Sequence, residues 1–251
     1  MNGLAWSPDS RFLTSTVQPG PIADAYKIRI WDTQNMGQPT YSANSYCEVM
    51  VGIAWSSDGV HIASAGTSCF PGYITCGGQV VGTSGRQVIL WNGNINPPTC
   101  GSLLGPRHNV SLISVAFSPK ADLVAAGSAG GRPLDDPSKI DIYNVATGAL
   151  LATLPGHSER SNVQSLDWCP DGSLLASAGF SSVEGYADRL IKIWNPASPD
   201  PVRQLTGDNC CYGVYSVAWS PDGKFLASGS SDGKGKIWGA YENLNPLRRL
   251  R

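Results

Sequence analysis

The sequence predicts an all-β protein built from five copies of one four-stranded antiparallel sheet. Two short phrases recur five times, one ending in an aromatic residue before a tight turn and the other ending a strand. The chain is rich in glycine (29) and proline (18), as many tight turns require, and no helical period of useful length appears. The aromatic positions are Trp6, Trp55, Phe117, Trp168 and Trp219 in the first phrase and Trp31, Trp91, Tyr143, Trp194 and Trp238 in the second. Since one copy cannot bury its own apolar face, the copies are expected to stack as the blades of a β-propeller.

The last copy shows how each strand is predicted. Residues 214–219 alternate between two faces, which is the period of a strand. Residues 220–223, Ser-Pro-Asp-Gly, supply a turn, because proline presets φ and glycine tolerates positive φ. Residues 225–229 return as a second strand, residues 234–238 form the third, and residues 247–250 form the fourth.

The same reading of the other copies places five blades in one domain, residues 1–251, a length that suits a single all-β domain. The predicted blade boundaries are approximately 1–45, 46–106, 107–157, 158–208 and 209–251. The first residues already belong to the first copy, so no signal peptide is expected in this chain. Three outcomes for the five blades stay open: a closed ring, an arc completed by another copy, or part of a longer chain.

The Ser-Pro-Asp-Gly turn, the Leu-Ala-Ser-Gly-Ser strand and the Ile-Trp ending resemble the WD-repeat β-propeller family from Leu4 to about Leu250. The Trp-Asp pair that names the family occurs only at Trp31-Asp32. The resemblance implies a buried structural network of His, Ser, Asp and Trp in each blade. Its positions are filled by His157, Ser177, Asp188 and Trp194 in blade four, and by Ser228, Asp232 and Trp238 in blade five.

The spacing of the aromatic positions indicates where the copies differ. The separation from one copy to the next is 24 to 26 residues, whereas the separation within a copy varies from 19 to 36. The extra residues lie between the second and third strands, at 17–25, 67–86, 129–138 and 180–189. In the family, these loops and the loops between blades open on one face, called the top, and loops on a rigid scaffold concentrate binding residues. The opposite face, with its regular turns, is expected to be plain.

The predicted partner-binding residues are the aromatic and basic side chains of these loops, since tyrosine and arginine are enriched at interface hot spots. They are Tyr26, Tyr46, Phe70, Tyr73, Arg107, His108, Arg160, Tyr186, Arg189, Tyr212 and Tyr215. The function predicted from them is a non-catalytic scaffold that binds a protein, peptide or glycan. The alternative is a structural subunit that associates with other copies.

The seven cysteines leave at least one thiol unpaired within the chain. Cys69 and Cys76 bracket a short loop within the longest insertion, and a disulfide there would stabilise by roughly 2–3 kcal/mol. Cysteines in such loops favour an extracellular or cell-surface location over a cytoplasmic one. The residues Asn109, Val110 and Ser111 match the Asn-x-Ser/Thr pattern of an N-glycosylation site.

Enzymatic chemistry is not expected. The three histidines are scattered and no Cys-x-x-Cys pair exists, so neither a metal nor another cofactor is predicted. A five-bladed glycosidase would need two carboxyl groups across the scissile bond, but the predicted innermost strands hold only Asp167, in a position that is alanine in the other copies. This residue is expected to face a neighbouring blade. The net charge of −1 excludes a nucleic-acid surface built on bulk charge, and no apolar run is long enough to insert into a membrane.

Overall fold

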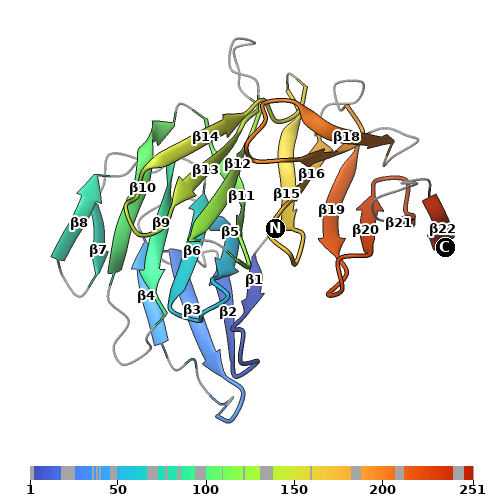
Figure 1. Ribbon diagram of the computed structural model, residues 1–251. Coiled ribbons are helices and arrows are strands. Elements are labelled where there is room, and N and C mark those ends of the chain that lie inside the picture. The colour runs from blue at the N-terminus through green and yellow to red at the C-terminus, as the bar shows by residue number, and fades with distance from the viewer. Residues whose placement is uncertain are drawn as a thin grey trace. The chain divides into compact units, whose positions relative to one another are not determined.

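The computed structural model describes most of the chain. The described residues are 3–17, 26–35, 37, 39, 41–45, 50–66, 73–76, 79–83, 86–93, 100–108, 110–120, 122–130, 138–158, 160–181, 188–206, 212–239 and 246–250. They contain strands and turns and no helix, and the strands form five antiparallel four-stranded sheets, which are the predicted propeller blades (Figure 1). The predicted all-β class is therefore confirmed.

Each blade consists of four strands. Blade one contains β1 (Leu4–Trp6), β2 (Phe12–Val17), β3 (Tyr26–Asp32) and β4 (Tyr41–Ser45), and blade two contains β5 (Met50–Trp55), β6 (His61–Gly66), β9 (Arg86–Asn92) and β10 (Cys100–His108). Blade three contains β11 (Leu112–Phe117), β12 (Leu123–Ser128), β13 (Ile140–Asn144) and β14 (Leu150–Leu154). Blade four contains β15 (Asn162–Trp168), β16 (Leu175–Phe180), β17 (Leu190–Trp194) and β18 (Pro201–Thr206), and blade five contains β19 (Val214–Trp219), β20 (Phe225–Ser230), β21 (Gly235–Gly239) and β22 (Pro246–Leu250).

The longest insertion, expected as a loop, carries its own hairpin. Strands β7 (Tyr73–Cys76) and β8 (Gln79–Thr83) pair antiparallel within residues 67–86 of blade two. Tyr73 is opposite Thr83 and Cys76 is opposite Gln79. The aromatic and β-branched residues of this segment favour a strand pair, which the comparison of spacings between copies does not reveal.

The turns between first and second strands follow from their sequence. In blade five, the Ser220 hydroxyl donates to Asp222 at 2.6 Å and accepts the Phe225 backbone N–H at 2.9 Å. Gly223 has a φ of +69°, the left-handed region in which glycine carries no Cβ penalty. Blade one places Ser10 at the same turn position with a φ of +59°.

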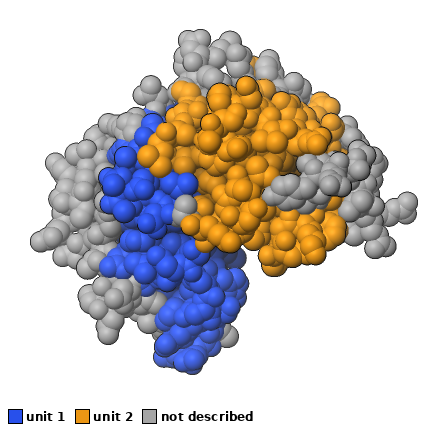
Figure 2. All heavy atoms as spheres, in the orientation of Figure 1, with its two compact units in different colours: residues 1–117, 122–124, 143–150 blue, residues 118–121, 125–142, 151–251 orange. Residues whose placement is uncertain are grey.

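By its internal contacts the chain divides into two compact units (Figure 2). Unit 1 comprises residues 1–117, 122–124 and 143–150, and unit 2 comprises residues 118–121, 125–142 and 151–251. Unit 1 buries Ile30, Ile62, Leu104 and Leu112 to 1% exposure or less. Unit 2 contains a core cluster shared by blades four and five, to which both blades contribute alternate strand residues. Each unit thus has a core of its own, as stacking of repeats requires.

Candidate functional site

Unit 2 gathers several predicted binding residues at one end of blades four and five. Asn162, at the start of β15, is opposite Phe180, at the end of β16, and Phe180 forms a bridge with Gly213, just before β19. The segments that carry Arg160, Phe180 and Tyr212 therefore meet at the same sheet ends. We call this end of unit 2 the loop face.

Three aromatic rings form a cluster on the loop face. The ring centroids of Phe180 and Tyr215 lie 4.6 Å apart with planes tilted by 30°, and those of Phe180 and Tyr212 lie 6.4 Å apart. Tyr212 is 37% exposed and Tyr215 is 40% exposed. Offset rings at such distances stabilise each other while leaving polar hydroxyls available to a partner. The sequence does not single out Phe180 as a binding residue, because its neighbours Tyr212 and Tyr215 belong to the next blade and meet it only in the folded structure.

Backbone hydrogen bonds hold the cluster in place. The Ser181 N–H donates to the Tyr212 carbonyl at 2.8 Å, and the Ser231 hydroxyl accepts the N–H groups of Tyr212 and Gly213 at 3.2 and 3.3 Å. Gly213 has a φ of +112°, and a Cβ there would overlap the carbonyl oxygen of Gly179. Glycine is therefore required for the close approach of the two blades beneath the rings.

The two arginines of the loop face have an unusual backbone. Arg160 and Arg189 have φ values of +61° and +57°, which non-glycine residues adopt rarely and mostly where the surrounding structure imposes it. The loops that carry them are tied together, because the Asp188 N–H donates to the Ser161 hydroxyl at 3.3 Å. Arg160 and Arg189 are both partly exposed residues.

Beneath these loops, blade four contains a continuous chain of buried hydrogen bonds. The Trp194 indole N–H donates to the Ser177 hydroxyl at 2.8 Å, and this hydroxyl lies 2.9 Å from His157 Nε2. His157 Nδ1 lies 2.8 and 3.0 Å from the two carboxylate oxygens of Asp188. The four side chains that the family resemblance assigns to one network are thus connected end to end.

The geometry of these hydrogen bonds implies that His157 is neutral. With His157 Nδ1–H donating to Asp188, the other ring nitrogen accepts the Ser177 hydroxyl proton, and every member is satisfied. Burial lowers the pKa of His157, although Asp188 opposes the shift. Burial raises the pKa of Asp188, but hydrogen bonds from His157 and from backbone N–H groups outweigh it, and the net pKa is lowered. The network therefore carries its charge on Asp188.

This arrangement has the same residue types as a Ser-His-Asp triad, but it lacks the access that a nucleophile needs. Ser177 is 0% exposed and His157 is 3% exposed. The Ser177 oxygen also accepts the Trp194 N–H, which would oppose its use as an attacking group. The network stabilises the blade and orients Asp188, whose carboxylate accepts the backbone N–H groups of Ser158 and Leu190.

The other blades keep only parts of this network. The tryptophan-to-serine hydrogen bond recurs as Trp31 to Ser15 at 3.2 Å, Trp91 to Ser64 at 2.9 Å and Trp238 to Ser228 at 3.0 Å. In blade five, Asp232 does not extend this pair among the described residues: it accepts hydrogen bonds from Ser230 and from the Lys234 N–H within its own turn. Asp208, which occupies the histidine position of this blade, lies outside the described residues.

His108 has a structural partner. Its Nε2 lies 2.7 Å from the hydroxyl of Tyr143, the residue that replaces tryptophan in blade three, and Tyr143 is 0% exposed. The residue expected among the partner-binding side chains therefore hydrogen-bonds a buried ring within unit 1. A Cβ on Gly105 would overlap this ring, so the tyrosine depends on the glycine for its space.

Asp167 faces the neighbouring blade, as its alanine-type position predicts. Its carboxylate accepts the backbone N–H of Trp219 in blade five at 2.6 Å. Burial raises its pKa to about 6, although the N–H groups of Trp219 and Trp168 oppose the rise. This perturbed carboxyl group is accounted for by its position between two blades.

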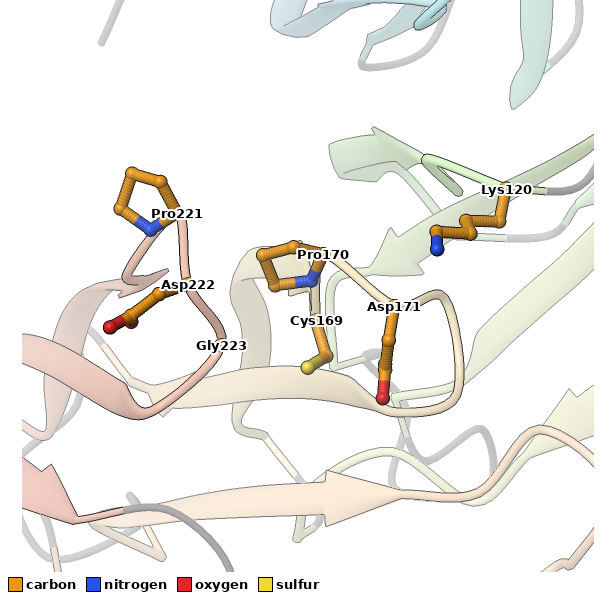
Figure 3. Close-up of a pocket in the computed structure, with 7 residues that line it drawn as sticks. All are labelled: Lys120, Cys169, Pro170, Asp171, Pro221, Asp222 and Gly223. Atoms are coloured by element: carbon orange, nitrogen blue, oxygen red, sulfur yellow. The ribbon is translucent and has the colours of Figure 1, made fainter.

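The ends of these blades opposite the loop face contain a cavity, whereas the sequence predicted only regular turns there. A cavity of about 270 Å³ lies among the turns and is lined by Lys120, Cys169, Pro170, Asp171, Pro221, Asp222 and Gly223 (Figure 3). The carboxylates of Asp171 and Asp222 point in different directions, and the Lys120 side chain extends toward the turn at Pro170 and Asp171 (Figure 3). These charged groups do not converge on one point, as a catalytic or metal site would require.

The remaining predicted residues are described in part or not at all. Tyr26, Tyr73 and Arg107 are placed by their backbones in β3, β7 and β10. Outside the described residues lie Tyr46, Phe70, Tyr186, Asn109 and Cys69, so the structure gives no test of the Cys69–Cys76 disulfide. Cys169 is buried and forms no disulfide bond. Among the described residues, no group of three or more His, Cys, Asp or Glu side chains could hold a metal ion, and no helix could span a bilayer.

The chain is similar in sequence to proteins that contain WD repeats. The model of the WD domain, G-beta repeat, matches residues 148–195 and 199–239. WD repeat-containing protein slp1 of Schizosaccharomyces pombe is 29% identical over 200 residues, which cover 79% of this chain and 34% of that protein. The Periodic tryptophan protein 2 homolog of the same organism is 33% identical over 136 residues, covering 53% of this chain and 14% of that protein. B-type cell cycle switch protein ccs52B of Medicago truncatula is 25% identical over 195 residues, covering 77% of this chain and 33% of that protein.

The chain spans about a third or less of the length of these relatives. By their names, the first is a WD repeat-containing protein and the last is a cell cycle switch protein, and neither name indicates a catalytic family. The matched segments run from β14 to β17 and from β18 to β21, so each joins the last strand of one blade to the first three strands of the next. Residues 148–195 and 199–239 therefore match WD repeats, and the sheets of the chain are blades of the β-propeller class.

Proposed function

We propose that this protein is a non-catalytic scaffold that holds a protein or peptide partner on the loop face of unit 2. The observation that carries the proposal is the exposed cluster of Phe180, Tyr212 and Tyr215, supported from two blades by fixed backbone hydrogen bonds. Rigid, partly exposed rings offer a large contact area at little entropic cost on binding. Because the matched family model is the WD domain and one relative is a cell cycle switch protein, we prefer a protein or peptide to a glycan as the occupant.

The partly exposed Arg160 and Arg189 add specificity to this surface. Their positions at the same sheet ends as the aromatic rings favour a partner that combines apolar side chains with carboxylates or free carbonyl oxygens. Arginine and tyrosine together are the residue types enriched where binding energy concentrates.

The proposal is tested with a phage-displayed library of random peptides selected on the wild-type protein. Peptides that bind are then measured on the double variant Tyr212→Ala/Tyr215→Ala. Val202→Ala is the matched control, since Val202 is 54% exposed on β18. We expect the tyrosine variant to bind at least about tenfold more weakly and the control to bind as the wild type does. Selected peptides that bind all three proteins equally would place the binding surface elsewhere and overturn the proposal.

A further inference from the structure

Asp188 holds the chain on both sides of Arg160. Its carboxylate accepts the Ser158 backbone N–H at 3.1 Å, and its own backbone N–H donates to the Ser161 hydroxyl at 3.3 Å. Ser161 is 0% exposed, and its hydroxyl also accepts the Ser158 hydroxyl at 3.1 Å. Asp188 is therefore bonded to the residues that enclose Arg160, although it lies 28 residues further along the chain.

The same carboxylate fixes the backbone around Arg189. It accepts the Leu190 N–H at 3.3 Å, and this hydrogen bond spans Arg189. Two of the three described non-glycine residues with a positive φ are Arg160 and Arg189. Glycine would adopt such a backbone without the strain that a Cβ brings. Strained residues persist where the surrounding structure imposes the strain, and they cluster at sites that clamp a ligand.

Asp188 is itself held in one orientation by blade four. His157 Nδ1 lies 2.8 and 3.0 Å from its two carboxylate oxygens, and Lys192 Nζ lies 3.7 Å from one of them. Lys192 is fixed as well, since its ammonium group donates to the Gly156 carbonyl at 2.8 Å. A side chain can set the position of its neighbours only when its own rotamer is locked in this way.

The corresponding aspartate of blade five does not connect two loops. Among the described residues, Asp232 hydrogen-bonds only Ser230 and the backbone N–H of Lys234, which belong to its own turn. The connection made by Asp188 is therefore not a general consequence of an aspartate at this place in a blade.

We infer that Asp188 is a positioning residue of the loop face: it sets the backbone of Arg160 and Arg189, and through them the binding of a partner that carries carboxylates. The part that concerns the partner rests on the proposed function. Asp188 acts without touching the partner, because its carboxylate is occupied by His157 and by the backbone N–H groups of the two loops.

The first test uses the protein without a partner. Trypsin cleaves after arginine, and cleavage of a folded chain requires local opening around the bond. Asp188→Asn replaces one accepting oxygen by an NH₂ group that only donates. Ser177→Ala is the matched control, because it removes the other end of the network and leaves Asp188 intact. The diagnostic bond follows Arg160, and the bond after Arg203, exposed on β18, is the internal reference for opening of the whole blade.

Circular dichroism establishes that each variant is folded, and mass spectrometry follows the fragments over time. We expect Asp188→Asn to raise the rate of cleavage after Arg160, relative to that after Arg203, by at least about tenfold, because a charge-assisted hydrogen bond to the loop is lost. Ser177→Ala should keep this ratio within about twofold of the wild type. Equal ratios in all three proteins would overturn the inference. An equal rise in both variants would also overturn it, since the stability of blade four would then explain the effect.

The second test asks whether Asp188 acts through Arg189. A peptide that contains carboxylates and was selected on the wild type is titrated into the wild type, Asp188→Asn, Arg189→Gln and the double variant. We expect each single variant to bind at least about tenfold more weakly. The double variant should bind only about twofold more weakly than Asp188→Asn, because the arginine that it lacks is already displaced.

Losses that multiply in the double variant, or an Arg189→Gln variant that binds as the wild type does, would overturn the inference. Failure of the proposed function has a different signature. The selected peptides would then bind Tyr212→Ala/Tyr215→Ala as they bind the wild type, while cleavage after Arg160 would still report whether Asp188 holds the loop.

Discussion

At the scale of single residues, the serine of the second strand decides how far each blade's network extends. Ser177 connects the indole of Trp194 to His157, whereas Ser228 has the corresponding bond to Trp238 and no histidine at the position taken by Asp208. The same residue type therefore satisfies two buried groups in blade four and one indole in blade five. A buried donor or acceptor without a partner destabilises by about 1–3 kcal/mol.

Replacing these serines should give unequal losses of stability. Ser177→Ala leaves the Trp194 N–H and His157 Nε2 without the hydroxyl, so we expect it to lower the free energy of unfolding by about 2–4 kcal/mol. Ser228→Ala leaves the Trp238 N–H alone and should lower it by about 1–2 kcal/mol. Urea denaturation followed by tryptophan fluorescence measures both values. Equal losses would show that His157 gains nothing from Ser177.

Asp167 should make stability depend on pH. Its pKa in the folded protein is raised to about 6 from 3.8, because it is buried between two blades. Folding therefore favours the protonated carboxyl group, and this contribution is present below about pH 3.8 and is lost as the pH rises through about 6. Asp167→Asn retains an oxygen to accept the Trp219 N–H but does not titrate.

We accordingly expect the wild type to lose stability relative to Asp167→Asn between pH 4 and pH 7. Urea denaturation of both proteins at unit steps of pH measures the difference. A difference that stays constant over this interval would contradict the raised pKa.

At the scale of elements, the junction before β19 couples blade packing to the loop face. Gly213 adopts a φ that other residues avoid, and it lies against the backbone of Gly179 and Phe180. The same residue pairs with Phe180 and accepts the Ser231 N–H at 3.0 Å. The position of Tyr212 relative to Phe180 thus depends on a backbone contact and not only on the rings.

Gly213→Ala is expected to displace the aromatic cluster. Its Cβ would overlap backbone atoms that cannot rotate away, so peptide binding on the loop face should weaken by at least about tenfold. Gly233→Ala is the matched control, because Gly233 also has a positive φ, +74°, but nothing lies within 4 Å of its added Cβ. The control should lose about 1 kcal/mol of stability and retain binding. Isothermal titration with a selected peptide separates the two outcomes.

At the scale of the whole molecule, the chain divides into two compact units, and each buries a core of its own. The proposed partner surface belongs to unit 2 alone, because Phe180, Tyr212 and Tyr215 all lie within it.

Much of the architecture could be predicted because it is local. Alternation of side chains, Ser-Pro-Asp-Gly turns and strand-ending tryptophans are properties of short segments, and they located the strands of the last copy within a residue or two. The family resemblance pointed to the His157 network, and the alanine in the position of Asp167 in other copies pointed to a neighbouring blade. The hairpin of β7 and β8 was not predicted, because the other copies contain no equivalent segment from which its strands could be inferred.

The sequence by itself determined the β class, the repeat of five and the residues that end each strand, since these follow from the period of side chains along one chain. Only the tertiary structure decided that Phe180 joins Tyr212 and Tyr215, that His108 hydrogen-bonds Tyr143, and that Ala227 is exposed where Ala63, Ala125 and Ala176 are buried. The physical reason is that burial and ring contacts depend on which surface lies opposite. Five nearly identical segments can therefore have different environments.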